Sequence, residues 1–348
     1  MTCPIGSGRA SRRGMTSLVV ASCLVLASQV GGYHWTKPGL AWPNSYYVPM
    51  AGFDGNNTLI SSYYNWSPSP VITPKGYSSL YAVPFPFIPM LWGCNATYTD
   101  AFQSAVDSNF SNAALTPDRV VLGFNEPDIT GQSDCSPSDA ASAWKTYLEP
   151  LRSKGYRVGS PAVSSGMSGK EWLEDWFEAC GGGCNPDFIA LHWYDIDAGD
   201  FIDHVKDYYQ TWNKSIWVTE FAVQNFTGTG ATQATLSQIN QFMDVVVAWM
   251  DTVEYVERYF WFGAMYDMQG VNPLNCLLDS AGEAKRTGAL NSLGVKYAGS
   301  NGSVTLASGG RGNQASSAAA GCRDFVRLVW PAGMSFALGI LGILGLVI

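Results

Sequence analysis

Two glutamates that each end an apolar run are the residues of this chain best suited to chemistry. Glu126 follows Val-Val-Leu-Gly-Phe-Asn and precedes Pro-Asp, and Glu220 follows Ile-Trp-Val-Thr and precedes Phe. Short apolar runs of this kind are typical of buried strands, so each carboxylate stands where a strand ends. In a parallel β/α barrel, the carboxyl ends of the strands form the active-site face. A pair of glutamates there is what hydrolysis of a glycosidic bond by two carboxylates requires.

Apolar runs alternate with amphipathic stretches along the chain, which favours βα units and a parallel sheet. Seven strands are predicted, at Ile60–Trp66, Phe87–Trp92, Val120–Glu126, Arg157–Pro161, Phe188–Tyr194, Ile216–Phe221 and Tyr259–Gly263. Five helices are predicted, at Asp100–Ser108, Pro137–Lys154, Gly169–Ala179, Gly199–Trp212 and Thr232–Thr252. This pattern and the chain length predict an α/β fold, a (β/α)8 TIM-like barrel in a single catalytic domain. The eighth strand has no clear signal; it lies in Leu40–Phe53 or is short.

The strand count also predicts how the two glutamates lie relative to each other. Glu126 ends the third predicted strand and Glu220 ends the sixth; one undetected strand before Ile60 or Phe87 would make them strands four and seven. An offset of three strands points two side chains at each other across the mouth of a barrel. We therefore expect the two carboxyl groups to face each other, about 5 Å apart.

Composition and charge argue against some classes of function and favour others. The formal net charge is −8, and the Lys and Arg residues form no cluster interleaved with aromatic residues, so nucleic-acid binding is not expected. Trp and Tyr are plentiful, and aromatic faces suit stacking on sugar rings, although most large aromatic residues belong to the core. The three histidines form no His-Glu-x-x-His motif and no Cys-x-x-Cys spacing occurs, so we predict neither a metal site nor another cofactor.

Both ends of the chain resemble processing signals. Residues 1–32 carry arginines followed by a short apolar stretch and small residues, which predicts a secretory signal peptide. Residues 33–298 are the predicted catalytic domain, and residues 299–321 are a linker rich in Gly, Ser and Ala. Residues 322–348 end in an apolar run that no charge follows, which predicts a GPI-attachment signal, with a transmembrane anchor as the alternative. Seven Asn-x-Ser/Thr sequons also favour a secreted glycoprotein.

Removal of both ends leaves an odd number of cysteines. They are Cys94, Cys135, Cys180, Cys184 and Cys276. In an oxidising compartment most of them should pair. Cys180 and Cys184 flank three glycines, which makes a local disulfide easy. Cys94 and Cys135 each follow a predicted strand end, so they could meet across neighbouring loops.

Several motifs together resemble one known family. Gly-Phe-Asn-Glu-Pro-Asp at 123–128 and Trp-Val-Thr-Glu-Phe at 217–221 are similar to the catalytic strands of the clan A glycoside hydrolases, which are retaining (β/α)8 enzymes. Five segments resemble glycoside hydrolase family 128 more narrowly: Tyr-Tyr-Asn-Trp at 63–66, Pro-Met-Leu-Trp-Gly at 89–93, the Asn-Glu-Pro-Asp run, Ala-Leu-His-Trp-Tyr at 190–194 and Phe-Trp-Phe-Gly at 260–263. The resemblance extends from roughly residue 37 to residue 298.

The resemblance implies an endo-β-1,3-glucanase of the fungal cell wall that acts with retention. It assigns Glu126 as the acid/base and Glu220 as the nucleophile. The candidates for binding the sugar are Asn125, Trp92, His192, Tyr194, Trp261 and Asn65. The expected partner is β-1,3-glucan, and we expect a monomer at the cell surface that meets the membrane only through its C-terminal anchor.

Two other functions stay open at this point. A non-hydrolytic glucan-binding protein would use the same aromatic cleft, but it would not need both glutamates. A transglycosylase that remodels glucan would keep both glutamates and differ in the aromatic residues on its acceptor side. The motifs alone do not separate this second alternative from a hydrolase.

Overall fold

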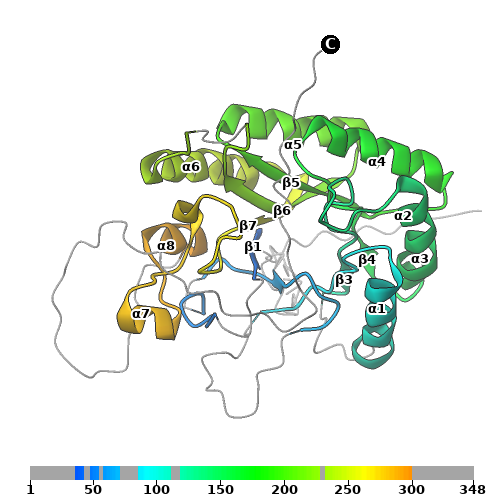
Figure 1. The fold of residues 1–348 in the computed structure, drawn as a ribbon, viewed down its shortest axis with the longest axis horizontal. Coiled ribbons are helices and arrows are strands. Elements are labelled where there is room, and N and C mark those ends of the chain that lie inside the picture. Colours follow the sequence, from blue (N-terminus) through cyan, green and yellow to red (C-terminus); the bar gives the residue numbers. More distant parts are fainter. Residues whose placement is uncertain are drawn as a thin grey trace, which may run out of the picture. The chain divides into compact units, whose positions relative to one another are not determined.

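The computed structural model describes residues 36–42, 48–54, 58–70, 85–110, 118–227 and 232–299. The strands are β1 Pro38–Ala41, β2 Tyr63–Tyr64, β3 Val120–Val121, β4 Arg157–Val158, β5 Phe188–Asp195, β6 Ser215–Val223 and β7 Val256–Trp261. The helices are α1 Ala96–Asn109, α2 Pro137–Ala143, α3 Glu149–Arg152, α4 Met167–Cys180, α5 Ala198–Trp212, α6 Leu236–Thr252, α7 Gly282–Thr287 and α8 Ser292–Ala298, with a π-helical turn at Trp144–Leu148 and a 3-10 turn at Pro273–Asn275. Helices α2, α4, α5 and α6 lie on the outer side of the strands (Figure 1).

The strands pair side by side and in parallel. One sheet has the order β2-β1-β7-β6-β5, and β3 pairs with β4. Isolated parallel bridges extend the pairing, and they join Tyr63 to Phe87, Met90 to Leu122, Gly159 to Phe188 and Val163 to Leu191. The domain is therefore α/β with parallel strands, and the carboxyl ends of those strands meet on one side, where the active site of such a fold lies.

Most of the predicted elements are present, but the predicted strand Phe87–Trp92 forms only isolated bridges, and the predicted helix Pro137–Lys154 is divided into α2, the π-helical turn and α3. Strands β5 and β6 and helices α4 and α5 lie within about two residues of the predicted bounds. Helix α6 begins later than predicted, because Thr235 and Gln238 form a capping box that starts the helix at Leu236. The strand that had no clear signal is β1, which overlaps Leu40–Phe53 only at Leu40 and Ala41. Helices α7 and α8 are not predicted by the sequence pattern.

The sequence also carries predictions about the ends of the chain and the cysteines. The predicted signal peptide, linker and apolar tail lie outside the described residues, except for Gly299 at the start of the linker. Within the described segments, no helix is both long and apolar enough to cross a membrane. Both expected disulfides are present, Cys94–Cys135 and Cys180–Cys184, and the Cys276 side chain is buried.

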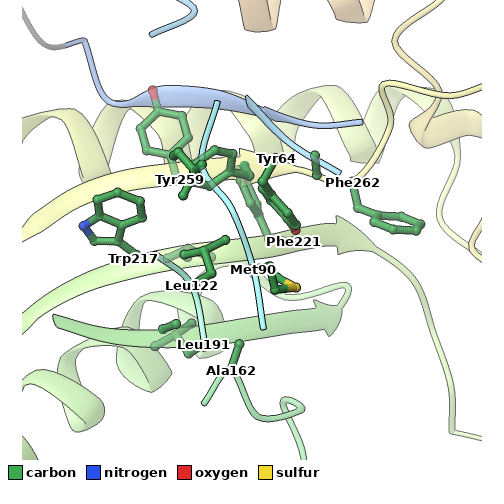
Figure 2. Packing of buried hydrophobic residues seen from close by; sticks show 14 of the residues in the cluster. Tyr64, Met90, Leu122, Ala162, Leu191, Trp217, Phe221, Tyr259 and Phe262 are labelled. Atoms are coloured by element: carbon green, nitrogen blue, oxygen red, sulfur yellow. The ribbon is translucent and has the colours of Figure 1, made fainter. Parts of the chain in front are cut away.

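Large apolar side chains from neighbouring strands pack against one another to form the core (Figure 2). Phe188 of β5 stacks on Trp217 of β6, with ring centroids 4.2 Å apart. Gly39 of β1 lies so close to Phe260 of β7 that a Cβ atom there would be 2.2 Å from the ring. The close β1–β7 pairing therefore requires glycine at this position.

A buried ion pair lies near the amino ends of β3 and β7. The Arg258 guanidinium donates to Asp118 Oδ2 at 3.1 Å and to the hydroxyl groups of Ser61 and Ser62 at 3.0 and 2.6 Å. It also lies over the Trp217 ring, 5.1 Å from the centroid. The side chains of Arg258 and Asp118 are only 8% and 4% exposed. A charge buried this deeply depends on its partner, because removing one member leaves the other uncompensated.

We expect Asp118→Ala to lower the free energy of unfolding by about 3 kcal/mol, because the buried Arg258 then loses its carboxylate. Denaturant unfolding measures the change. The control is Glu283→Ala, which removes a carboxylate from a pair with Arg286 whose side chains are 61% and 76% exposed. This control should leave the unfolding midpoint unchanged, since exposed pairs contribute little. Equal effects of the two variants would contradict the structural role of Asp118.

Candidate active site

Glu126 lies just beyond β3 in a strained backbone conformation. Its φ is +39°, in the left-handed region that residues with a side chain rarely adopt. Its amide donates to the Ala162 carbonyl at 2.7 Å, and Asn125 before it bridges to the same residue. The turn that follows is closed by a bond from Ser133 N to Asn125 O at 3.3 Å. These bonds hold the Glu126 backbone in a conformation that an isolated chain would not favour.

Glu220 projects from β6 and is 5% exposed. Strands β5 and β6 pair with Leu191 opposite Val218, and their register then shifts, so that His192 is paired with Glu220 rather than with Thr219. Paired residues on neighbouring strands point to the same face of a sheet. The shift therefore places the His192 and Glu220 side chains next to each other at the carboxyl ends of the two strands.

His192 lies between the two glutamates. Its Nδ1 is 2.9 Å from Glu126 Oε1, and its Nε2 is 3.6 Å from Glu220 Oε1. One carboxylate oxygen of each glutamate and one ring nitrogen lie within 4.8 Å of one another. The His192 side chain is fully buried, whereas the side chains of Glu126 and Glu220 are 12% and 6% exposed. The trio is thus a compact acid–base group with little access to water.

Two further side chains donate hydrogen bonds to Glu220. Trp66 Nε1 donates to Oε1 at 2.7 Å, and the Tyr194 hydroxyl donates to Oε2 at 2.6 Å. Tyr64 lies close by, and its hydroxyl donates to the Thr219 carbonyl at 2.7 Å. Both oxygens of Glu220 therefore have a donor, which favours the carboxylate over the neutral acid.

Burial and neighbouring charges shift the acid–base balance of the site. Burial raises the pKa of Glu220; His192 opposes this shift and the Glu126 charge adds to it. Burial alone would lower the pKa of His192, but the charges of Glu220 and Glu126 and the hydrogen bond to Glu126 outweigh it, so the pKa is raised. Burial and the nearby Glu220 charge raise the pKa of Tyr194 well above its ordinary value, so Tyr194 stays protonated as a donor at neutral pH.

Both glutamates open onto one cavity. The cavity is lined by Trp66, Asn125, Glu126, Gln132, Tyr194, Glu220, Phe226, Phe262, Gln269 and Val271. Of the residues predicted from the sequence, the structure thus brings together Glu126, Glu220, Asn125 and Tyr194 at this cavity, and His192 lies behind its wall. Its aromatic residues give the cavity apolar surface beside the carboxylates, a combination that suits a sugar ring.

Two of the predicted sugar-binding residues point elsewhere, and their chain neighbours take their place. Trp261 is fully buried, and its Nε1 donates to the Asn275 carbonyl at 2.9 Å, so it cannot stack on a ligand. Asn65 forms a local turn through Ser67 N and Ser69 O. The residues that line the cavity are Phe262 and Trp66. In each case the side chain at the cavity is that of the next residue along the chain.

Trp92 is also not among the residues that line the cavity. Its ring packs on Tyr98 of α1, with centroids 4.5 Å apart, and its backbone carbonyl accepts from Asn125 N at 2.9 Å. Trp92 therefore supports the segment that carries the catalytic candidates rather than the cavity surface. Two cavity residues without a signal in the sequence, Gln132 and Phe226, lie in loops after β3 and β6. Loops carry no periodic signal, although Phe226, the middle residue of the sequon at 225–227, is an unusually apolar loop residue.

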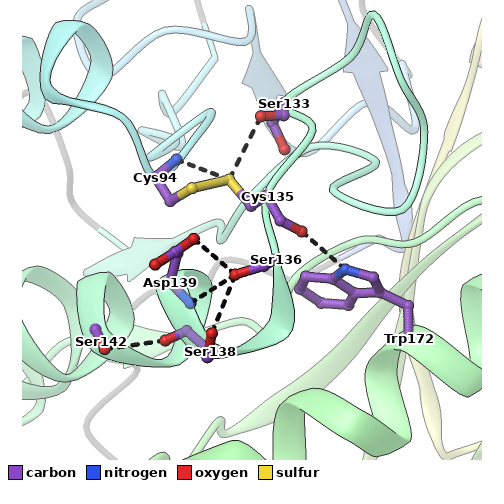
Figure 3. Close-up of a disulfide and its surroundings, with 8 residues drawn as sticks. All are labelled: Cys94, Ser133, Cys135, Ser136, Ser138, Asp139, Ser142 and Trp172. Carbon is purple, nitrogen blue, oxygen red and sulfur yellow. Dashed lines mark hydrogen bonds between the residues drawn. A yellow bond between two sulfur atoms is a disulfide. The ribbon is translucent and has the colours of Figure 1, made fainter.

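The loop that follows Glu126 is fastened at several points (Figure 3). The Cys94–Cys135 disulfide ties it to the loop after the Phe87–Met90 segment, and Trp172 Nε1 of α4 donates to the Cys135 carbonyl at 2.9 Å. Asp128 accepts from the amide of Ser164 at 3.0 Å and from its hydroxyl group. These contacts fix both sides of the turn in which Glu126 is strained.

Among the described residues, Glu126, His192 and Glu220 form the one group of ligand-type side chains close enough to hold a cation. Their atoms already interact with one another and with donors from Trp66 and Tyr194. A carboxylate that accepts two N–H or O–H bonds has less capacity left for a metal. We therefore interpret the trio as an acid–base group, and the absence of a metal cofactor stays a prediction.

Comparison with known proteins places this chain in a family. The model of the glycosyl hydrolase catalytic core matches residues 39–297. Alkali-sensitive linkage protein 1 of Schizosaccharomyces pombe is 32% identical over 264 residues, which cover 73% of this chain and 44% of that protein. The chain thus spans less than half of the length of this relative.

Solved structures of family 128 glycoside hydrolases are also similar. A curdlan-specific exo-β-1,3-glucanase from Blastomyces gilchristii, in complex with glucose, is 30% identical with a TM-score of 0.57, over 75% of this chain and 97% of that chain. An endo-β-1,3-glucanase from Amycolatopsis mediterranei, a glutamate-to-glutamine mutant in complex with laminarihexaose, is 26% identical with a TM-score of 0.56, over 76% and 99%. The chain belongs to glycoside hydrolase family 128.

Replacing Cys94 and Cys135 with serine should lower the free energy of unfolding by about 4 kcal/mol, because the bridge joins residues 41 positions apart. The matched control replaces Cys180 and Cys184, which are 4 positions apart. This change should lower the free energy of unfolding by about half as much. Denaturant unfolding under non-reducing conditions compares the two double variants.

The same pair of variants tests whether the Cys94–Cys135 bridge holds the Glu126 turn. Hydrogen exchange of the amides in residues 126–135 should become faster when this bridge is removed, because the turn loses its covalent fastening. The amides should exchange as in the unmodified protein when Cys180 and Cys184 are replaced. Unchanged exchange in both variants would show that the hydrogen bonds alone hold the turn.

Proposed function

We propose that this member of glycoside hydrolase family 128 hydrolyses β-1,3-glucan by a retaining double displacement, with Glu126 as acid/base and Glu220 as nucleophile. The observation that carries the proposal is the pair of carboxylates with oxygens within 4.8 Å at one cavity. Retaining glycosidases hold their two carboxyl groups about 5–5.5 Å apart, and inverting ones about 6.5–9.5 Å apart. The short separation leaves no room for a water molecule between nucleophile and sugar, which supports direct attack.

The hydrogen bonds support this division of roles. Donors from Trp66 and Tyr194 stabilise the charged form of Glu220, and a nucleophile must be charged. The Glu126 side chain is twice as exposed as that of Glu220, 12% against 6%, which suits a group that exchanges protons with a departing sugar and with water.

In the first step, Glu126 protonates the glycosidic oxygen while Glu220 attacks the anomeric carbon and forms a glycosyl-enzyme. In the second step, Glu126 takes a proton from a water molecule that attacks the same carbon and releases Glu220. Two inversions restore the anomeric configuration. The buried negative charge of Glu220 also stabilises the positive charge that develops on the sugar in each transition state.

The lining of the cavity supports a sugar ligand. Phe262 and Trp66 present aromatic surface next to the carboxylates, and Phe226, which is 51% exposed, extends this surface to the cavity mouth. Asn125 Oδ1 is buried and has no hydrogen-bond partner among the described residues, so it is available to accept a bond from a sugar hydroxyl group. Tyr194 is close enough to Glu220 to position it and also lines the cavity.

We propose endo cleavage of the glucan, as the sequence resemblance implies. The family 128 relatives with solved structures include both endo- and exo-acting β-1,3-glucanases. The early products from laminarin distinguish these modes: endo cleavage gives oligosaccharides of several lengths at once, and exo cleavage gives one short product. Products longer than an oligosaccharide substrate would instead favour a glucan-remodelling transglycosylase.

We also propose that the strands close into a (β/α)8 barrel. The Phe87–Met90 segment, which bridges to Tyr63 on one side and to Leu122 on the other, supplies an eighth parallel segment between β2 and β3. The bridge between Gly159 and Phe188 joins the β4 segment to β5. In this order Glu126 ends the fourth segment and Glu220 lies on the seventh.

The proposed domain organisation follows from the sequence. The family match at residues 39–297 falls inside the proposed catalytic domain, residues 33–298. We propose that the flanking segments direct the chain to secretion and GPI attachment, so that a monomeric enzyme is held at the cell surface or in the wall. Tethering raises the effective concentration of the enzyme at an insoluble polymer without tighter binding.

Glu220→Gln should reduce kcat on laminarin by roughly 10³-fold or more while glucan binding is kept, because the amide has the shape of the carboxylate but cannot attack. Hydrolysis rates and binding of laminarihexaose measure the two effects. The control is Glu174→Gln on the exposed face of α4, which should leave both unchanged. Full hydrolysis by the Glu220 variant would refute the assignment.

Glu126→Ala should also lose most activity, and azide should restore part of it on aryl glucosides with good leaving groups, because a small anion can replace the water that needs a base. NMR of the first product from laminarin should show the β anomer. An α anomer as first product would exclude double displacement.

Phosphatidylinositol-specific phospholipase should release the protein from membranes of the producing cells, because the proposed anchor is a phosphatidylinositol lipid. Immunoblots of the soluble and membrane fractions measure the release. A mature, membrane-bound chain that still contains residues 322–348 would establish a transmembrane anchor instead. A protein wholly in the culture medium would show that no anchor is attached.

A further inference from the structure

We propose that His192 holds the proton that Glu126 delivers in catalysis, so that the acid of this site is a Glu126–His192 pair rather than one carboxyl group. This inference rests on the proposed function. His192 then acts as a positioning residue that moves a proton and does not touch the substrate. The geometry points to this role because His192 lies between Glu126 and Glu220 and behind the cavity wall.

The contacts of the imidazole define two protonation states. When His192 is charged, Nδ1–H donates to Glu126 Oε1 at 2.9 Å and Nε2–H points toward Glu220 Oε1 at 3.6 Å. When His192 is neutral with its proton on Nε2, Nδ1 accepts a bond from a protonated Glu126. The two states differ only in the position of one proton along a 2.9 Å hydrogen bond, and the net charge of the trio is −1 in both.

No other described group around His192 can take this role. Tyr194 keeps its proton, because burial and the Glu220 charge raise its pKa well above the ordinary value, and the same holds for Tyr64. Asp128 accepts two bonds from Ser164. Trp66 donates to Glu220 through an indole N–H, which does not titrate.

Charge balance favours a protonated His192 in the resting site. Two carboxylates within 4.8 Å and nearly without solvent repel each other strongly. A positive imidazolium between them offsets this repulsion, and the Glu220 and Glu126 charges raise the pKa of His192 despite its burial. The second histidine with described surroundings, His204, behaves in the opposite way, since burial lowers its pKa to about 4.

The proton moves through the reaction as follows. The Nδ1 proton of His192 passes to the Glu126 carboxylate, which delivers it to the glycosidic oxygen as the bond to the anomeric carbon breaks and the Glu220 ester forms. Glu126 then takes a proton from the attacking water as the ester bond breaks. That proton returns to Nδ1 of His192, so the enzyme ends in its starting state and needs no other proton source.

The test compares His192→Asn with the unmodified enzyme. An Asn amide can still donate a hydrogen bond to Glu126, but it cannot hold or release a proton. The proton must then reside on Glu126 alone, so the basic limb of the kcat/KM profile should move to lower pH by about one unit or more. The kcat/KM on laminarihexaose at neutral pH should fall roughly 100-fold.

A substrate with an activated leaving group separates proton delivery from simple positioning. On 2,4-dinitrophenyl β-laminaribioside, kcat/KM should fall much less than on laminarihexaose, because that leaving group departs without a proton. Equal losses on both substrates with an unmoved basic limb would overturn the proposal and leave His192 a purely structural role. If the unmodified enzyme does not cleave laminarihexaose, the proposed function fails rather than this inference.

A second measurement needs no variant of His192. In ¹⁵N-histidine NMR of the full protein at pH 7, His192 should be charged with both ring nitrogens protonated, whereas His204 should be neutral. In Glu220→Gln, which removes the charge facing Nε2, the His192 titration should shift to lower pH. A neutral His192 at pH 7 in the unmodified protein would overturn the proposal even if His192→Asn fails to fold.

Discussion

The burial of two carboxylates side by side is the constraint on which the rest of this structure depends. At the separation of the Glu126 and Glu220 oxygens, repulsion between two charges is about 3 kcal/mol at an effective dielectric of about 20. Hydrogen-bond donors from three residues offset this repulsion: Trp66 beyond β2, and His192 and Tyr194 on β5. Each donor is held by packing before any ligand arrives, so the field of the site is already in place for reaction.

Because these donors come from distant parts of the chain, the site cannot form before the sheet does. Trp66 and Glu220 are 154 residues apart, and they meet only when β2, β1, β7 and β6 lie side by side. The register shift that pairs His192 with Glu220 is likewise a property of two assembled strands. Substitutions that weaken the packing of β1 or β7 should therefore disturb the catalytic group as well as stability.

The sequence predicted the parts of the site that carry a periodic or chemical signal. Strands β5 and β6 are long apolar runs, so Glu220, His192 and Tyr194 could be placed at their ends. Short segments carry a weaker signal for the orientation of their side chains. Strand β2 has only two residues, and the direction of the Trp66 side chain depends on a positive φ of 54°, which the sequence pattern does not predict. The sequence likewise indicated Trp261 and not Phe262 as the residue at the site, because β7 ends between them. Loop residues such as Gln132 depend on tertiary contacts that local patterns do not encode.

The two ends of the strands carry different kinds of buried polar group. Arg258 and Asp118 are buried together at the amino ends of the strands, where each compensates the other. At the carboxyl ends, Glu126 keeps a strained backbone, and Asn125 Oδ1 and His192 Nε2 lack hydrogen-bond partners among the described residues. Such features lower stability unless the surroundings hold them. A sugar hydroxyl group can donate a hydrogen bond to Asn125 Oδ1, so this unpaired atom of the site is one that a bound substrate would satisfy.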